Sequence, residues 1–188
     1  MMMNISLRKA NAIQKQILES IAEIEITADV TINEFQDPEL EIANAKVTLM
    51  DNDRKRATLT TALFNIRALV AEGNHQSGIN LLLTKSALAE KRIQQVRELS
   101  QFRPVKSLEV IKGRLEKMKT RKDGEHYGRD EVTTGIVGRK DIEQFKVELR
   151  EIQKQKRKYA DEILELNVKT EVPLSEDTIK VLTEAGII

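Results

Sequence analysis

A seven-residue repeat of apolar positions near the C-terminal end is the strongest pattern in the chain. Eight positions follow a 3-4-3-4-3-4-3 spacing, and seven of them are apolar or aromatic. This spacing puts all eight side chains on one narrow stripe of a continuous helix, which we predict over residues 140–166. The predicted packing residues of this heptad stripe are Ile142, Phe145, Leu149, Ile152, Lys156, Tyr159, Ile163 and Leu166.

A lysine, Lys156, interrupts the heptad stripe. A lysine in a helix seam costs stability if it is buried, but it can fix the register of two helices when it faces an acidic partner. Alternatively, the neighbouring helix is absent at this level, or the lysine stem carries its ammonium out to water.

The first third of the chain contains two helical patterns separated by an alternating one. Ser6 is a suitable N-cap for a helix that we predict to run to about residue 25. Apolar and polar residues then alternate over 26–32, which predicts a half-buried strand. Asp37 and Pro38 form a cap and a first helical position, and they predict the start of a second helix.

This second helix carries two apolar stripes and extends to about residue 72. A wide apolar face of this kind predicts at least two neighbouring helices. A turn over 73–78 and a further helical pattern over 84–101, capped by Thr84 or a nearby residue, predict an antiparallel hairpin. We expect Phe64 to pack against the heptad helix or against the 88–99 segment. The first stripe is Val47, Met50, Arg54, Ala57, Thr61, Phe64, Ala68 and Ala71, and the second is Leu59, Leu63, Ile66 and Val70.

The remaining segments are shorter. Turn residues and apolar spacing predict a basic helix over 106–121, an exposed loop over 122–129 and a strand or arm over 132–137. They also predict a strand over 168–172 that Pro173 ends, and a final helix over 178–185 that Ser175 caps and Gly186 stops.

Together these patterns predict a mainly α fold, an elongated antiparallel helical bundle or coiled coil with two or three short β-strands at helix ends. We expect one elongated helical domain over 1–172, which includes the hairpin 44–101 and the heptad helix 140–166. Residues 173–188 would form a C-terminal capping or docking helix.

The amino-acid composition excludes several kinds of site and segment. The 188 residues include no cysteine, which excludes disulfides and cysteine-ligated zinc, and aromatic residues make up only 3%. No apolar run approaches the roughly 18 residues that a membrane span requires. The first residues lack the apolar segment of a signal peptide, so we expect a soluble protein made in the cytoplasm.

Charge is unevenly distributed along the chain although its net value is only +1. Residues 16–45 contain eight acidic residues and no lysine or arginine, whereas 103–122 contains eight basic residues and two acidic ones. The two segments are either solvated faces or surfaces that neutralise each other, within one subunit or between subunits. The residues that could make such electrostatic contacts include Arg114, Lys117, Lys119, Arg121, Lys122 and Arg129.

No motif predicts catalysis, a metal site or a cofactor. Asp51 starts a segment like a calcium loop, but cations occupy its ligand and turn positions. Gly135 and Gly138 lack the order of a phosphate-binding loop. His75 and His126 stand alone in predicted loops. The basic run 154–158 is compensated by nearby acidic residues on a helix. We therefore expect a protein that is not an enzyme.

The order of elements resembles the septicolysin-like proteins, small helical proteins of bacteria and their phages. The resemblance covers residues 5–172 and lies in the opening helix, the middle hairpin, the passage into the heptad helix and the exit from it. Residues 103–124 and the tail from Pro173 depart from the pattern. The quoted segments are Ser6–Ala10, Ala57–Leu69 with Thr84–Leu99, Arg129–Val132 through Val137 into Asp141–Ile142, and Leu166–Val172.

The resemblance implies a helical hairpin protein and a place in a phage particle. By that analogy, we expect a structural component of a tailed-bacteriophage virion, near the tail, neck or appendages, assembled in the host cytoplasm. Its partners would be further copies of itself and other structural proteins. The alternative is a protein of the bacterial cytoplasm, a coiled-coil binding module whose basic 103–129 segment contacts nucleic acid or an acidic protein.

Overall fold

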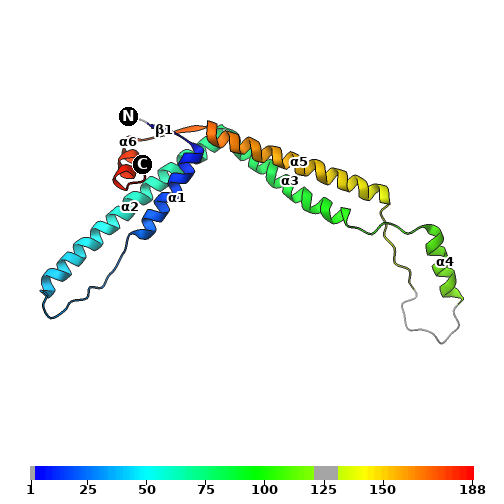
Figure 1. Ribbon diagram of the computed structural model, residues 1–188, viewed down its shortest axis with the longest axis horizontal. Helices are drawn as coiled ribbons and strands as arrows, with labels where there is room; N and C mark the ends of the chain where they lie inside the picture. Colours follow the sequence, from blue (N-terminus) through cyan, green and yellow to red (C-terminus); the bar gives the residue numbers. More distant parts are fainter. Residues whose placement is uncertain (1–2, 121–130) are drawn as a thin grey trace. The chain divides into compact units, whose positions relative to one another are not determined.

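The protein is mainly helical, as predicted, and a computed structural model describes its residues 3–120 and 131–188. Within these residues it has six α-helices and one two-stranded antiparallel sheet (Figure 1). Its contacts divide the chain into two compact units, Met1–Leu82 with Glu162–Ile188 (unit 1) and Leu83–Asp161 (unit 2). This division differs from the predicted boundary after residue 172. The predicted coiled-coil packing stays a prediction.

The sheet of unit 1 joins residues from the two ends of the chain. Strand β1, Met3–Ser6, pairs antiparallel with β2, Glu171–Leu174, so that Met3 lies opposite Leu174. The predicted strand over 168–172 is therefore shifted towards the C-terminus, and Pro173 lies inside the strand instead of ending it. The β1 strand was not predicted.

Helix α1, Leu7–Glu23, begins where the sequence predicts. The Ser6 hydroxyl accepts a hydrogen bond from the Lys9 amide, at 3.2 Å, and so caps the helix. The buried side chains Leu7, Ala10 and Ile13 lie one turn apart and form one face of the helix. That face packs against α2.

The predicted strand over 26–32 is wrong. These residues form no regular element, and Ile26 and Val30 are exposed. An alternating pattern gives a strand only when another strand pairs with its backbone, and β1 and β2 already pair with each other.

Helix α2, Pro38–Gln76, is longer than predicted because it continues through residues 73–76, which the sequence assigns to a turn. Asp37 caps it by accepting from the Glu39 amide at 3.0 Å. The second predicted stripe, Leu59 to Val70, is buried, whereas every residue of the first stripe is exposed. The helices and strands that bury α2 are α1, β2 and α6, in place of the predicted partner helix over 84–101.

The core of unit 1 is formed where these elements meet. Ile66 on α2 and Leu174 on β2 are fully buried in it. Its other members come from α1, from the sheet, from the start of α3 and from α6. The buried members are Ile5, Leu7, Ala10, Ile13, Ile17, Leu59, Leu63, Ile66, Val70, Ile79, Val172, Leu174 and Leu182.

The final helix, α6 at Glu176–Glu184, is confirmed together with both of its predicted end signals. The Ser175 hydroxyl accepts from the Thr178 amide at 3.3 Å and bonds the Thr178 hydroxyl at 2.9 Å. Gly186 ends the helix with a φ of 68°, a conformation that glycine adopts without strain. Helix α6 packs on α2.

Unit 2 is built from parts of three helices, α3 at Ile79–Ser100, α4 at Leu108–Lys119 and α5 at Arg139–Lys169. Helix α3 follows α2 after two residues, Ser77 and Gly78, and so begins before the predicted cap at Thr84. Helices α3 and α5 run side by side in opposite directions (Figure 1).

The predicted strand over 132–137 is also wrong. Its residues are in irregular extended backbone, joined to the segment before α4 by one isolated bridge between Pro104 and Val137. The predicted loop over 122–129 lies wholly outside the described residues.

Candidate interaction surfaces

The heptad stripe is the least exposed face of α5. Ile142 is buried, and the other seven positions of the stripe are half-buried. Only Glu148, Gln153 and Asn167 among the other residues of α5 are not exposed. The stripe has residues in both units. Ile163 packs against the core of unit 1, while Lys156 contacts Glu90 of α3 within unit 2. Leu166 also packs against the unit 1 core.

Two ion pairs set the register between α3 and α5. Lys156 donates from Nζ to Glu90 Oε2. Arg92 donates to Glu148 Oε1 from both Nε and Nη2, at 2.9 and 2.7 Å. The acidic partner considered for the seam lysine is therefore a residue of the same chain, and the hydrogen bond from Lys156 with its positive charge lowers the pKa of Glu90.

Helix α3 contributes only a narrow apolar face to its contact with α5. Ala89, Ile93 and Val96 are its buried residues within unit 2, and Leu88 beside them is 70% exposed. A two-helix contact of this kind covers each stripe from one side only. The half-buried state of the heptad stripe follows from that geometry.

A second apolar surface lies open on α2. Phe64, predicted to pack against another helix of the chain, is 57% exposed, and the Arg67 guanidinium lies 5.1 Å from its ring centroid. Val47 and Met50 on the same predicted stripe are exposed as well. Two helices, α1 and α6, pack on α2, as the wide apolar face predicts, but neither covers the stripe that includes Phe64.

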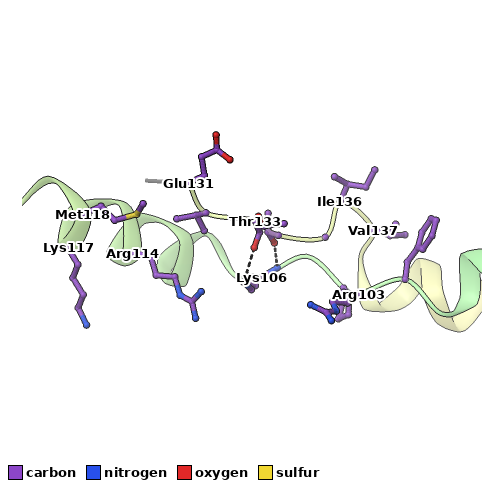
Figure 2. A pocket seen from close by; sticks show the side chains of 14 residues that line it. Arg103, Lys106, Arg114, Lys117, Met118, Glu131, Thr133, Ile136 and Val137 are labelled. Atoms are coloured by element: carbon purple, nitrogen blue, oxygen red, sulfur yellow. Dashed lines mark hydrogen bonds between the residues drawn. The ribbon is translucent and has the colours of Figure 1, made fainter. Parts of the chain in front are cut away.

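A basic cavity of about 810 Å³ lies beside α4 (Figure 2). Its lining carries the cations Arg103, Lys106, Arg114 and Lys117, against the single carboxylate of Glu131. Figure 2 shows Arg114 and Lys117 pointing away from Glu131.

Backbone bonds between two distant segments build this cavity. The Val105 amide donates to the Val137 carbonyl at 2.8 Å, and the Lys106 amide donates to the Thr134 hydroxyl at 2.9 Å. Lys106 Nζ also donates to the Thr133 carbonyl at 2.8 Å, so its charge is already engaged. Gly135 permits the approach, because a Cβ there would lie 1.8 Å from the Arg103 carbonyl oxygen.

The predicted electrostatic residues are only partly brought together. Arg114 and Lys117 line the cavity, while Lys119 is exposed on α4 outside it. Arg121, Lys122 and Arg129 lie outside the described residues. Sequence reasoning did not single out Glu90, Arg92 and Glu148 as partners of the seam. The lysine in the stripe was the one signal that pointed to an acid on the facing helix.

The heptad stripe, the open face of α2 and the basic cavity have properties that are typical of binding surfaces. Apolar faces can associate with other apolar faces, and the cavity offers positive charge to an anion. Within residues 3–120 and 131–188, no three histidine, cysteine, aspartate or glutamate side chains are grouped to hold a metal ion. Over the same residues, no helix has both the length and the apolar character to cross a membrane.

No protein-family model, curated protein or solved structure matches the chain significantly. Any inference about its function therefore depends on the surfaces described above.

Proposed function

We propose that this chain is a non-enzymatic structural protein that associates with copies of itself through apolar helix faces. The observation that carries the proposal is the amount of surface left open. The accessible surface is 14580 Å² for a mass of 21.4 kDa. Two separate compact domains sharing that mass would expose only about 11,000 Å².

The apolar character of the exposed surface supports the same proposal. The exposed residues include large side chains on long helices, such as Leu40 and Phe64 on α2 and Leu88 on α3. Exposed apolar residues at helical spacing mark faces that other proteins cover. We place the assembly in a tailed-bacteriophage virion, in the tail, neck or appendage region, on the strength of the resemblance to the septicolysin-like proteins.

Light scattering coupled to size exclusion tests the association. We expect a mass above 21.4 kDa that rises with protein concentration and stays above the monomer mass at physiological salt, because the apolar part of the contact is not screened. A strictly monomeric species at all concentrations would overturn self-association. Mass spectrometry of purified particles, from a phage that carries the gene, tests the location.

The basic cavity supports a second candidate function, a binding module for nucleic acid. Phosphate contacts through Arg114 and Lys117 would weaken steeply between about 50 and 200 mM salt. Fluorescence anisotropy with a labelled duplex measures this. Substituting both cations with alanine should abolish the binding, while alanine at Lys154 and Lys158 on the exposed face of α5 should leave it unchanged.

A further inference from the structure

Helix α4 contributes no buried side chain to the chain it belongs to. Leu108, Lys112, Leu115 and Lys119 follow each other at spacings of 4, 3 and 4, so they form one stripe on one face of the helix. Leu108 is 70% exposed and Leu115 is 42% exposed. This stripe of alternating leucine and lysine is separate from the Arg114 and Lys117 pair that lines the cavity.

The first half of α2, residues 38–58, also contributes no buried side chain. Leu40 and Val47 lie two turns apart on one face and are 57% and 60% exposed. Acidic residues surround the start of this segment, including Glu34 and Glu39, which are both exposed. No lysine or arginine occurs between residues 16 and 45.

The two surfaces complement each other in both properties that matter for docking. Each offers exposed aliphatic side chains one or two turns apart, and one is basic where the other is acidic. We propose that the α4 stripe of one copy docks on the first half of α2 of a second copy. This inference rests on the proposed self-association and names the surfaces that carry it.

The contact joins two different surfaces, so it is head-to-tail. Such a contact leaves one free α4 stripe and one free α2 surface after each addition, and repetition builds a closed ring or an open filament. A protein partner fits the α4 stripe better than a nucleic acid does. A phosphate backbone would pair with Lys112 and Lys119 but would leave the two leucines of the stripe in water.

Charge exchange tests the docking. The acid-reversed variant carries Glu34→Lys with Glu39→Lys, and the base-reversed variant carries Lys112→Glu with Lys119→Glu. Each alone presents two surfaces of like charge, so we expect its apparent dissociation constant for self-association to rise by about tenfold or more. An equimolar mixture of the two restores opposite charges at every contact, so association should return. Circular dichroism verifies that both variants are folded.

The control variant carries Lys154→Glu with Lys158→Glu on the exposed face of α5. It has the same change of net charge as the base-reversed variant, and its self-association should equal that of the wild type. A loss of association in this control would assign the effect to net charge and overturn the docking.

The remaining outcomes separate the two proposals. If the wild type never associates, both fail. If it associates and neither reversal changes the dissociation constant, the docking fails while self-association stands. If each variant loses association but the mixture does not recover it, the two surfaces do not meet between copies. If the base reversal only abolishes binding to a labelled DNA duplex, the stripe contacts nucleic acid instead.

Discussion

Lys156 is a charged residue in an apolar stripe, and its role depends on one carboxylate. Its ammonium donates to Glu90 on the facing helix, and both side chains remain partly exposed. A contact at that exposure adds little stability because water screens it. It does select one register of α3 against α5, since a shift by one turn would separate the two charges.

The hydrogen bond from Lys156, with its charge, lowers the pKa of Glu90 from the ordinary value. Substituting Lys156→Met removes both and should raise the pKa of the Glu90 carboxyl towards its ordinary value. NMR titration of the side-chain carboxyl measures this shift, and Lys158→Met, on the exposed face, is the matched control. An unchanged Glu90 pKa in the Lys156 variant would mean that the pair does not form in solution.

The same pair gives a stability term with a defined sign. Because the folded-state pKa of Glu90 is depressed, its contribution is fully present above the ordinary glutamate value. It is lost as the pH falls through the lowered folded value. The wild type should therefore lose its small advantage over Lys156→Met at acid pH, as measured by urea unfolding.

Gly135 allows two backbone segments to touch. An alanine Cβ would overlap the Arg103 carbonyl oxygen at 1.8 Å, so Gly135→Ala should break the bond between the Val105 amide and the Val137 carbonyl. Overpacking of this kind costs about 1–3 kcal/mol. Thermal unfolding and amide exchange at Val105 measure the loss.

Gly113 is the control for that substitution. It lies inside α4 with nothing within 4 Å of an added Cβ. Gly113→Ala should stabilise the helix by up to about 1 kcal/mol, because alanine restricts the unfolded chain and favours helix. Equal effects of the two substitutions would contradict the close approach at residue 135.

Helix α2 shows that the spacing of apolar residues along a helix does not predict which face another element covers. Its two stripes have similar spacing, yet only the one that includes Ile66 is buried, and the one that includes Phe64 is open. Periodicity identifies a face, but it does not tell which neighbour covers that face. The number of packing helices is a tertiary property, and the two helices that pack on α2, α1 and α6, both leave the Phe64 stripe open.

Two substitutions two residues apart separate these stripes. Ile66 is fully buried, so Ile66→Ala should cost about 2–5 kcal/mol through lost burial and a residual cavity. Phe64→Ala should cost less than about 1 kcal/mol, since it loses only the exposed ring and its contact with Arg67. Urea unfolding in dilute solution, where assembly does not contribute, measures both. Similar losses would show that Phe64 is covered within the chain.

The predicted elements succeed where their signals are local. Ser6, Asp37 and Ser175 cap helices as predicted, because a cap needs only its own first turn. The predicted strands over 26–32 and 132–137 fail, and β1 was not predicted, because a strand needs a distant partner and β1 pairs with residues from the other end of the chain. The cavity beside α4 was missed for the same reason, since it depends on Gly135 meeting Arg103.

The whole chain distributes its buried residues unevenly. The fully buried side chains Leu7, Ile66 and Leu182 belong to unit 1, while α4 has no buried residue. Local opening requires little energy where few apolar contacts must be broken. A molecule built in this way keeps a stable core and presents less stable segments that a neighbour can order.

Hydrogen exchange should reveal that distribution and its change on assembly. In dilute solution, amides of β1 and of α2 from residue 59 onward should exchange slowest, and those of α4 fastest among the helices, because α4 lacks buried contacts. At concentrations where light scattering reports assembly, α4 and residues 38–50 should both gain protection, because each is covered by the other on a second copy. Mass spectrometry of peptides from the two states measures this. Protection gained on the Phe64 stripe alone would move the contact along α2, away from its acidic end.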